Sequence, residues 1–307
     1  MNHSSHSLKV LPKSLPTSVS NFVNYSLLWR QRKLIVRFAS DRYGSWNFPP
    51  CSRSDWLVDC LQRSPVKLVK LDLSLGETNL KTWADACHKA NKVAYVRLPA
   101  TAQLPQKQHP FNWRLKRLFD WLIAALLLVL LSPVMAWVAL LITWFSPGPI
   151  FFYQWRVGER GKLFKIIKFR TMDIGAEQLH HQVMGSQEGL HKLKDDPRIT
   201  ALGRWIRRYS LDELPQLLNV LKGEMSLVGP RPWALYDAIR ISPDLQHRLN
   251  ALPGITGAWQ VEARATMRDL STVNRGDLRY LHGWSLWKDF RFLLLTIPKV
   301  IAGFGAY

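Results

Sequence analysis

The chain has 307 residues and 47% hydrophobic content, which is enough for one large or two ordinary domains with packed cores and excludes a disordered protein. Lys and Arg number 42 against 22 Asp and Glu, so the partner or surface is anionic: nucleic acid, acidic phospholipid or a phosphorylated substrate. Fourteen Trp favour the membrane interface, where indole rings settle at headgroup depth and cations meet lipid phosphate.

Residues 1–32 are expected to form a polar tail. They are rich in Ser and Asn and lack the continuous apolar core of a secretory signal, so neither cleavage nor export is expected. The three cysteines, Cys51, Cys60 and Cys87, have no metal-ligand spacing, and reduced thiols facing the cytoplasm are the simplest account of them.

Residues 33–99 alternate between strand and helix patterns. Strands are expected at 34–38, 66–73 and 93–98, and helices at 54–61 and 78–90. Together they predict a small α/β domain. Nothing in this segment has the composition of a catalytic site, so a regulatory role and an interaction both stay open. Residues 100–110 are polar and contain proline, which predicts a linker.

The run from Trp121 to Phe145 contains no charged residue and is long enough for a membrane-spanning helix. Ser132 and Pro133 fall at its midpoint, where proline removes a backbone donor and clashes with the preceding turn, so a sharp bend is expected. The carbonyl that Pro133 leaves without a donor could be satisfied by the Ser132 hydroxyl or by a neighbouring helix.

The arms on either side of Pro133 are too short to cross a bilayer. Each has about 12 residues, or roughly 18 Å, against a hydrocarbon core about 30 Å thick. Cations lie beyond both ends of the run, from Arg114 to Arg117 and from Arg156 to Arg170, which places both ends on the cytoplasmic side. We therefore expect a re-entrant helix over about residues 118–145; an ordinary Pro-kinked span is the alternative.

Two basic motifs are candidates for phosphate binding. Lys168 and Arg170 point to one side of the segment Phe164–Met172 if it is extended, although a solvated basic strand has the same pattern. Arg231 stands between two prolines that fix the backbone, and a rigidly held guanidinium suits bidentate recognition of phosphate. An arginine that only occupies a turn is the alternative.

Two adjacent carboxylates, Asp212 and Glu213, stand at the start of an apolar helix. Ser210 is expected to cap this helix with Glu213 at the capping-box position, and Gly223 is expected to end it. Because the helix dipole favours acidic first turns, a purely structural role is the alternative.

A further helix, aromatic and apolar, is expected from Trp284 to about Pro298, lying in the membrane interface or in the core. The predicted fold class is α+β. A mainly helical, membrane-associated catalytic domain with a re-entrant helical hairpin and interfacial amphipathic helices covers residues 111–307. The small α/β domain precedes it.

Six motifs, in order along the chain, resemble those of the bacterial sugar transferases, the monotopic phosphoglycosyl transferases. They are Lys168–Met172, Asp196–Thr200, Ser210–Gln216, Gly229–Pro232, Pro253–Gln260 and Gly303–Tyr307. The resemblance implies a membrane enzyme that transfers a sugar-1-phosphate from a UDP-sugar to a polyprenyl (undecaprenyl) phosphate, releases UMP and requires Mg²⁺. This would be the first membrane step of exopolysaccharide or glycoconjugate synthesis. Residues 262–265 depart from the Asn-Gly-Arg-like stretch of many relatives, so sugar recognition is not carried over there.

The same resemblance makes Asp212 the nucleophile that forms a covalent aspartyl-phosphosugar intermediate. Glu213 would hold Mg²⁺ with Asp212 or set the charge of the pair. Lys168 and Arg231 match the phosphate ligands of the family, and the strand pattern adds Arg170. Ser132 and Pro133 match the family's break in the re-entrant helix. The expected partners are a UDP-sugar, a polyprenyl phosphate and an anionic phospholipid membrane on its cytoplasmic side, and a homodimer is compatible with the pattern.

Two other functions compete with this one. A non-enzymatic basic membrane scaffold would recruit partners through residues 33–99 and would not depend on Asp212. Nucleic-acid binding would use the net charge of +20 but leaves the uncharged run unexplained, so nucleic acid is not an expected partner. The sequence leaves the sugar open among glucose, galactose and an N-acetylated hexosamine.

Overall fold

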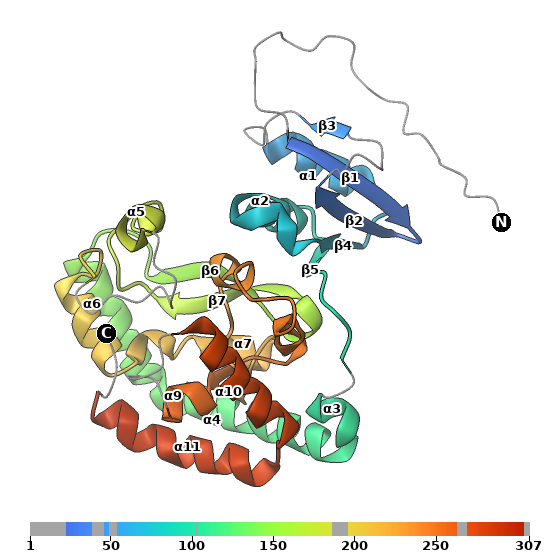
Figure 1. The fold of residues 1–307 in the computed structure, drawn as a ribbon. Helices are drawn as coiled ribbons and strands as arrows, with labels where there is room; N and C mark the ends of the chain where they lie inside the picture. Colours follow the sequence, from blue (N-terminus) through green and yellow to red (C-terminus); the bar gives the residue numbers. More distant parts are fainter. Residues whose placement is uncertain are drawn as a thin grey trace.

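The computed structural model describes residues 23–38, 46–48, 54–101, 104–185, 196–262 and 269–303 (Figure 1). An N-terminal α/β unit carries a five-stranded sheet of order β3-β1-β2-β4-β5. Its strands are β1 (Val23–Arg30), β2 (Lys33–Phe38), β3 (Trp46–Phe48), β4 (Leu68–Leu71) and β5 (Val93–Val96), and its helices are α1 (Ser54–Arg63), the 3-10 turn η1 (Leu73–Leu75) and α2 (Gly76–Lys89). The strands and helices predicted within residues 33–99 are present. The strand predicted at 66–73 is shorter, because the Asp72 side chain caps η1 by accepting from the Ser74 amide.

The predicted polar tail is wrong for residues 23–30, which form β1. This strand pairs antiparallel with β2 through a two-residue turn, in which Gln31 and Arg32 both have positive φ. Such turns match the twist of the strands they join. Tyr25 of β1 is buried, and its hydroxyl donates to Asn79 of α2. Residues 1–22 of the tail lie outside the described residues.

The second unit is mainly helical and contains two pairs of strands, which confirms the α+β class. Its helices are α3 (Pro105–Gln108), which lies in the predicted linker, α4 (Pro110–Phe145), α5 (His180–Met184), α6 (Ala201–Arg208), α7 (Gln216–Leu221), α8 (Leu235–Ala238), α9 (Ala258–Glu262), α10 (Leu270–His282) and α11 (Leu286–Ile301). The 3-10 turns are η2 (Glu159–Gly161), η3 (Leu211–Glu213) and η4 (Gln246–Asn250). β6 (Phe151–Val157) pairs antiparallel with β7 (Leu163–Phe169), and β8 (Ser226–Val228) pairs parallel with β9 (Gly254–Thr256).

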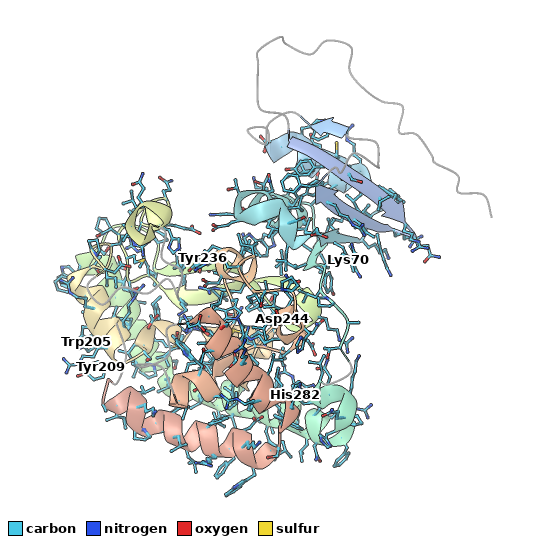
Figure 2. All side chains as sticks on the ribbon, in the orientation of Figure 1. Lys70, Trp205, Tyr209, Tyr236, Asp244 and His282 are labelled. Atoms are coloured by element: carbon cyan, nitrogen blue, oxygen red, sulfur yellow. The ribbon has the colours of Figure 1, made fainter. Side chains whose placement is uncertain are left out.

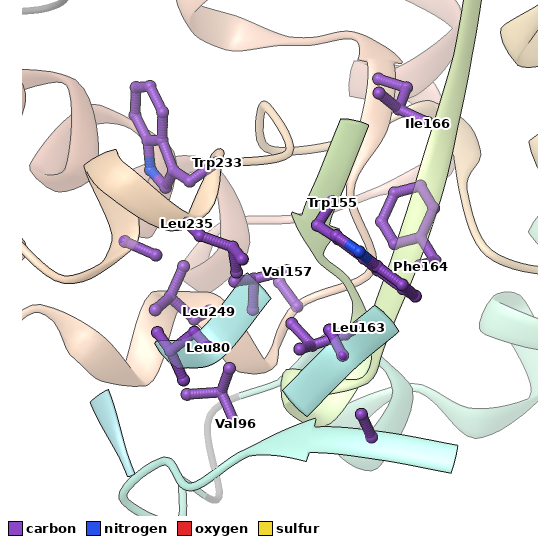
Figure 3. Close-up of a cluster of buried hydrophobic side chains, with 14 of the residues drawn as sticks. Leu80, Val96, Trp155, Val157, Leu163, Phe164, Ile166, Trp233, Leu235 and Leu249 are labelled. Atoms are coloured by element: carbon purple, nitrogen blue, oxygen red, sulfur yellow. The ribbon is translucent and has the colours of Figure 1, made fainter. Parts of the chain in front are cut away.

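A continuous hydrophobic core joins the two units. Leu80 of α2 and Val96 of β5 lie in the same buried cluster as Val157, Leu163 and Leu249 of the second unit (Figure 3). At the edge of the sheet the backbones come so close that a Cβ on Gly161 would lie 2.4 Å from the Val96 carbonyl oxygen. The N-terminal unit is therefore packed directly against the strands that carry part of the candidate site.

α4 continues through Pro133 as a helix, and the expected re-entrant bend at this position stays a prediction. The Val129 carbonyl, which Pro133 leaves without its helical donor, accepts a hydrogen bond of 2.8 Å from the Ser132 hydroxyl. Of the two ways in which this carbonyl could be satisfied, the local one is therefore used. α4 is long and apolar enough to cross a membrane.

Much of α4 is apolar and exposed. Its exposed large side chains include Leu118, Phe119, Trp121, Leu122, Leu126, Val129, Leu130, Val134, Trp137, Leu140, Trp144 and Phe145. Water solvates such a surface poorly, and a contiguous patch of this kind marks a membrane or a partner. Trp137 packs edge-on against Trp205 of α6, which lies next to Tyr209 on the outside of the molecule (Figure 2).

Both ends of α4 are held by the second unit. Near the start, Lys116 donates to the Val228 carbonyl at 3.1 Å and Arg117 to the Met225 carbonyl at 2.9 Å. At the far end, Arg170 donates to the carbonyls of Ser146 and Pro147, just beyond the last helical residue.

α11 buries a charged residue and exposes large apolar side chains, which is the opposite of a helix in a hydrophobic core. Asp289 is buried, where it forms an ion pair of 2.7 Å with Lys116 and accepts hydrogen bonds from Tyr280 and Trp284. Trp287, Phe290, Leu294, Leu295, Ile297 and Ile301 are exposed instead. The helix extends beyond its predicted end, with Pro298 inside it.

Candidate active site

The structure brings Lys168 of β7 next to both adjacent carboxylates. Its ammonium nitrogen lies 2.7 Å from Glu213 Oε1 and 3.5 Å from Asp212 Oδ2. Asp212 is 8% exposed, so its carboxylate is largely withdrawn from water but paired with a cation. Burial of a charged group is tolerated when such a partner is present.

Asp212 and Glu213 are held by a turn rather than by the predicted capped helix. α6 ends at Arg208 with Tyr209 as its C-cap, and Ser210 then adopts a left-handed conformation with φ of 53°. This conformation is costly for a residue with a side chain and is concentrated at functional sites. The two carboxylates follow in η3, and α7 starts only after Pro215. The predicted capping box is wrong, because Pro215 and not Ser210 occupies the N-cap of α7.

Two arginines that the sequence analysis did not assign to the site lie near these carboxylates. Burial lowers the pKa of Arg207, whereas Asp212 and Glu213 act on it in the opposite direction. The Arg207 Nε donates to the Thr171 hydroxyl at 2.8 Å. The sequence feature that could have assigned Arg207 to the site is its position in the basic stretch directly before Ser210.

Arg156 of β6 is the second such arginine. It is buried and donates to the Pro232 carbonyl at 3.1 Å and to the side chain of Gln154. Burial lowers its pKa, and both Glu213 and Arg231 are close enough to act on its charge. Arg156 therefore links the carboxylates to the Arg231 loop. Its Nε is buried without a hydrogen-bond partner within the described part of the chain.

Arg231, between its two prolines, lies against Trp259 and Arg248. Its guanidinium lies 5.4 Å from the centre of the Trp259 ring, and its backbone carbonyl accepts from Arg248 at 2.7 Å. Gly229, directly after β8, lies so close to β9 that a Cβ on Gly254 would lie 2.1 Å from the Gly229 nitrogen.

Arg170 is not brought to the carboxylates. Its side chain is 8% exposed and donates to the Ser146 and Pro147 carbonyls, at 2.5 and 2.7 Å. The expectation that Arg170 and Lys168 share one phosphate-binding edge is wrong, because Arg170 follows the end of β7 and turns toward the end of α4. Arg170 stabilises that helix end by satisfying carbonyls that lack helical donors.

A third group of polar side chains lies around α8. Burial raises the pKa of Asp237 to about 6, against the opposing effects of Arg156, Arg231 and Arg240. The adjacent Tyr236 stacks on His180, with ring centroids 4.3 Å apart.

Arg198 contacts the same histidine, and it forms a 2.6 Å ion pair with Asp196. Burial alone would raise the pKa of Asp196, but hydrogen bonds and charge from Arg198 hold it below its ordinary value.

Within the described residues, no group of three or more His, Cys, Asp or Glu is arranged to enclose a metal ion. Asp212 and Glu213 supply two carboxylates on neighbouring residues. Mg²⁺ is commonly bound by one or two carboxylates together with water and substrate phosphates, so this donor set fits Mg²⁺ when a phosphorylated substrate supplies further oxygens. Residues 263–265 of the divergent stretch and residues 304–307 of the last motif lie outside the described residues.

Comparisons with known proteins concern mainly the second unit. The model of the family described as "Bacterial sugar transferase" matches residues 111–303. "Undecaprenyl-phosphate galactose phosphotransferase" of Salmonella typhimurium is 42% identical over 200 residues, which are 63% of this chain and 42% of that protein. The chain thus spans less than half the length of this relative.

Two shorter relatives are covered more fully. "UDP-glucose:undecaprenyl-phosphate glucose-1-phosphate transferase" of Caulobacter vibrioides is 41% identical over 200 residues, or 62% of this chain and 72% of that protein. "Exopolysaccharide production protein ExoY" of Sinorhizobium fredii is 39% identical over 201 residues, or 62% of this chain and 88% of that protein. The N-terminal unit lies outside the family match.

Proposed function

The chain belongs to the bacterial sugar transferase family, and from this membership we propose that it transfers a sugar-1-phosphate from a UDP-sugar to undecaprenyl phosphate and releases UMP. The contact of Lys168 with Asp212 and Glu213 carries the proposal. A carboxylate that attacks a diphosphate needs cations to offset the repulsion, and Arg156 and Arg207 add charge to the same region. The names of the relatives favour glucose or galactose as the sugar.

The proposed reaction has two balanced steps. A carboxylate oxygen of Asp212 attacks the phosphorus that bears the sugar, and the bond from this phosphorus to the oxygen of UMP breaks, so that UMP leaves with the electron pair. The phosphate oxygen of undecaprenyl phosphate then attacks the same phosphorus, which releases the Asp212 carboxylate and forms the lipid diphosphosugar. Dividing the transfer in this way replaces one difficult step by two easier ones.

Asp212 and Glu213 would hold Mg²⁺ through carboxylate oxygens. The ion would neutralise charge on the diphosphate oxygens. Lys168 fixes the positions of the two carboxylates relative to each other. Arg156 and Arg207 attract the diphosphate. The buried Arg156 Nε has an unused donor for this purpose within the described residues.

The membrane would present the second substrate. The exposed apolar residues of α4 and α11 would lie in one leaflet, with both ends of α4 on the cytoplasmic side, where the second unit holds them. The lipid-linked phosphate lies at headgroup depth, so the site must lie there too. The net charge of +20 suits an anionic phospholipid surface.

The test is a UMP-release assay on the purified full-length chain with undecaprenyl phosphate and a panel of UDP-sugars. We expect Asp212→Asn to lower turnover at least about a thousandfold, since the amide is not a nucleophile, while membrane binding is unchanged. Labelled phosphosugar should be trapped on the unsubstituted protein at Asp212. Sustained turnover by Asp212→Asn would refute the covalent route. A scaffold without enzymatic activity would release no UMP in any arm.

A further inference from the structure

A small pocket lies between the two units, and three of its lining residues come from the N-terminal unit. Glu77, Lys81 and Asp85 of α2 form one wall. Tyr153, Gln154 and Trp155 of β6 and Tyr236 of α8 form much of the other. Tyr236 lies just below α2 in the view of Figure 2. The family match begins at residue 111, so the α2 wall lies outside it.

Specific contacts fix the two walls relative to each other. Asp85 accepts a hydrogen bond of 2.9 Å from the Trp155 indole and lies 3.5 Å from the Lys165 ammonium. Lys81 lies 3.2 Å from Glu177. The shared hydrophobic core lies beneath these contacts, so the pocket is a built feature and not a gap between loosely associated domains (Figure 3).

The pocket adjoins the candidate active site through Arg156. The side chain of Gln154 accepts a hydrogen bond from Arg156, and Tyr236 acts on the charge of that guanidinium. Glu213 is close enough to act on the pKa of the same guanidinium. Glu77 is close enough to act on the pKa values of both Tyr236 and Asp237.

The chemistry of the pocket suits an uncharged polyhydroxyl ring. It contains three aromatic rings and, in a strongly basic protein, three carboxylates against two ammonium groups. A phosphate group would meet no excess of positive charge here. A hexose ring presents hydroxyl donors, which carboxylates and an amide accept, and an apolar face, which packs on aromatic rings.

We propose that this pocket binds the hexose ring of the nucleotide-sugar donor and that Glu77 accepts hydrogen bonds from its hydroxyl groups. The N-terminal unit thereby takes part in selecting the sugar. This inference rests on the proposed function, because it assigns the part of the donor that extends beyond the transferred phosphate. Asp85 and Lys81 position the wall.

The experiment compares the full-length protein with Glu77→Gln, using UDP-glucose, UDP-galactose and UDP-N-acetylglucosamine. For the best donor we expect KM to rise about tenfold, equivalent to about 1.4 kcal/mol, with kcat within about twofold and a changed order of preference among the three sugars. Inhibition by UMP should be unchanged, because UMP carries no hexose. Asp59→Asn, which removes an exposed carboxylate from α1 of the same unit, is the matched control and should behave as the unsubstituted protein.

Hydrogen exchange gives a readout that does not depend on turnover. Amides of α2 should be protected by a UDP-hexose and not by UMP. Equal protection by both ligands, no protection by either, or unchanged donor KM values in Glu77→Gln would overturn the inference. If the unsubstituted protein releases no UMP from any donor, the proposed function fails, and protection of α2 by UDP-hexose still decides whether the pocket binds the sugar.

Discussion

Lys168 is placed where a single ammonium group contacts two carboxylates, and this pairing offsets the burial of Asp212. The sequence singled out all three residues through the family resemblance, and the structure places them in contact; their roles in catalysis stay a prediction. It could not identify Arg156 or Arg207, since an arginine among many in a basic chain carries no local signal. Their role depends on how β6 and α6 fold over the carboxylates.

Arg170 is the reverse case, because the sequence analysis assigned it to the site and the structure places it against other groups. Alternation along an extended segment predicts Lys168 and Arg170 on one side, but it cannot predict which groups each side chain contacts there. Only the structure shows that two carbonyls at the end of α4 bind this guanidinium.

Asp237 should make stability depend on pH. Its pKa is raised from 3.8 to about 6 by burial, despite the nearby Arg156, Arg231 and Arg240 and with a small contribution from Glu77. Between these two values the folded protein binds more protons than the unfolded chain, so the free energy of unfolding falls as pH rises. The total loss is roughly 3 kcal/mol at about 1.36 kcal/mol per unit of pKa, and it is complete above about pH 7.

Asp237→Asn removes this titration. We expect its free energy of unfolding to increase relative to the unsubstituted protein between about pH 4 and pH 7, measured by denaturant unfolding in detergent at several pH values. A difference between the two proteins that stays constant with pH would contradict the assignment.

At the scale of elements, periodicity predicted β2, β4, β5, α1, α2, α4 and α11, but it missed several elements, β1 among them. The prediction of a polar tail follows from the Ser and Asn content of the whole N-terminal stretch, whereas residues 23–30 themselves are mostly apolar and aromatic and favour a strand. Pairing with β2 and burial of Tyr25 against α2 hold this strand in place. The motifs Gly229–Pro232 and Pro253–Gln260 are a similar case. The sequence contains both motifs, but it does not show that they contact each other.

The close approach of Gly229 and Gly254 leads to a prediction about Gly254. A Cβ at this position would lie 2.1 Å from the Gly229 nitrogen and 2.6 Å from the Thr256 carbonyl oxygen, so the backbone must move. We expect Gly254→Ala to lower the free energy of unfolding by about 2 kcal/mol and to reduce activity, because the loop that carries Arg231 shifts.

Gly276→Ala is the matched control. Gly276 lies inside α10 with nothing within 4 Å of a Cβ built on it, so alanine should stabilise the protein by about 0.5–1 kcal/mol. Denaturant unfolding of both variants tests the pair. Equal effects of the two substitutions would show that the loops separate more easily than their contact suggests.

At the scale of the whole molecule, the sequence predicted an α/β unit before a membrane-associated unit and a boundary between them. It could not predict that the two units share a core, because the residues involved, such as Leu80 and Val157, look like ordinary interior residues of their own units. The scaffold hypothesis treated residues 33–99 as independent. Their packing against β6 and β7 favours a role coupled to the candidate site.

The placement of both ends of α4 gives the last prediction. In a background in which the three native cysteines are replaced, Asn112→Cys and Pro149→Cys place exposed thiols beyond the two ends of the apolar run. Both should react with a membrane-impermeant maleimide from the cytoplasmic face only, as should Lys222→Cys, which reports the side of the second unit. Labelling of the first two from opposite faces would show a true crossing.

The attachment of both ends of α4 to one unit also bears on how the protein reaches its membrane. Moving a guanidinium or ammonium group through hydrocarbon is costly, and a helix with cations at both ends would have to carry one set across in order to span. In the proposed topology both flanks stay on the side of synthesis, and only uncharged residues need to enter the lipid. Insertion could then follow folding of the anchoring unit, as a partitioning step that needs no translocation channel.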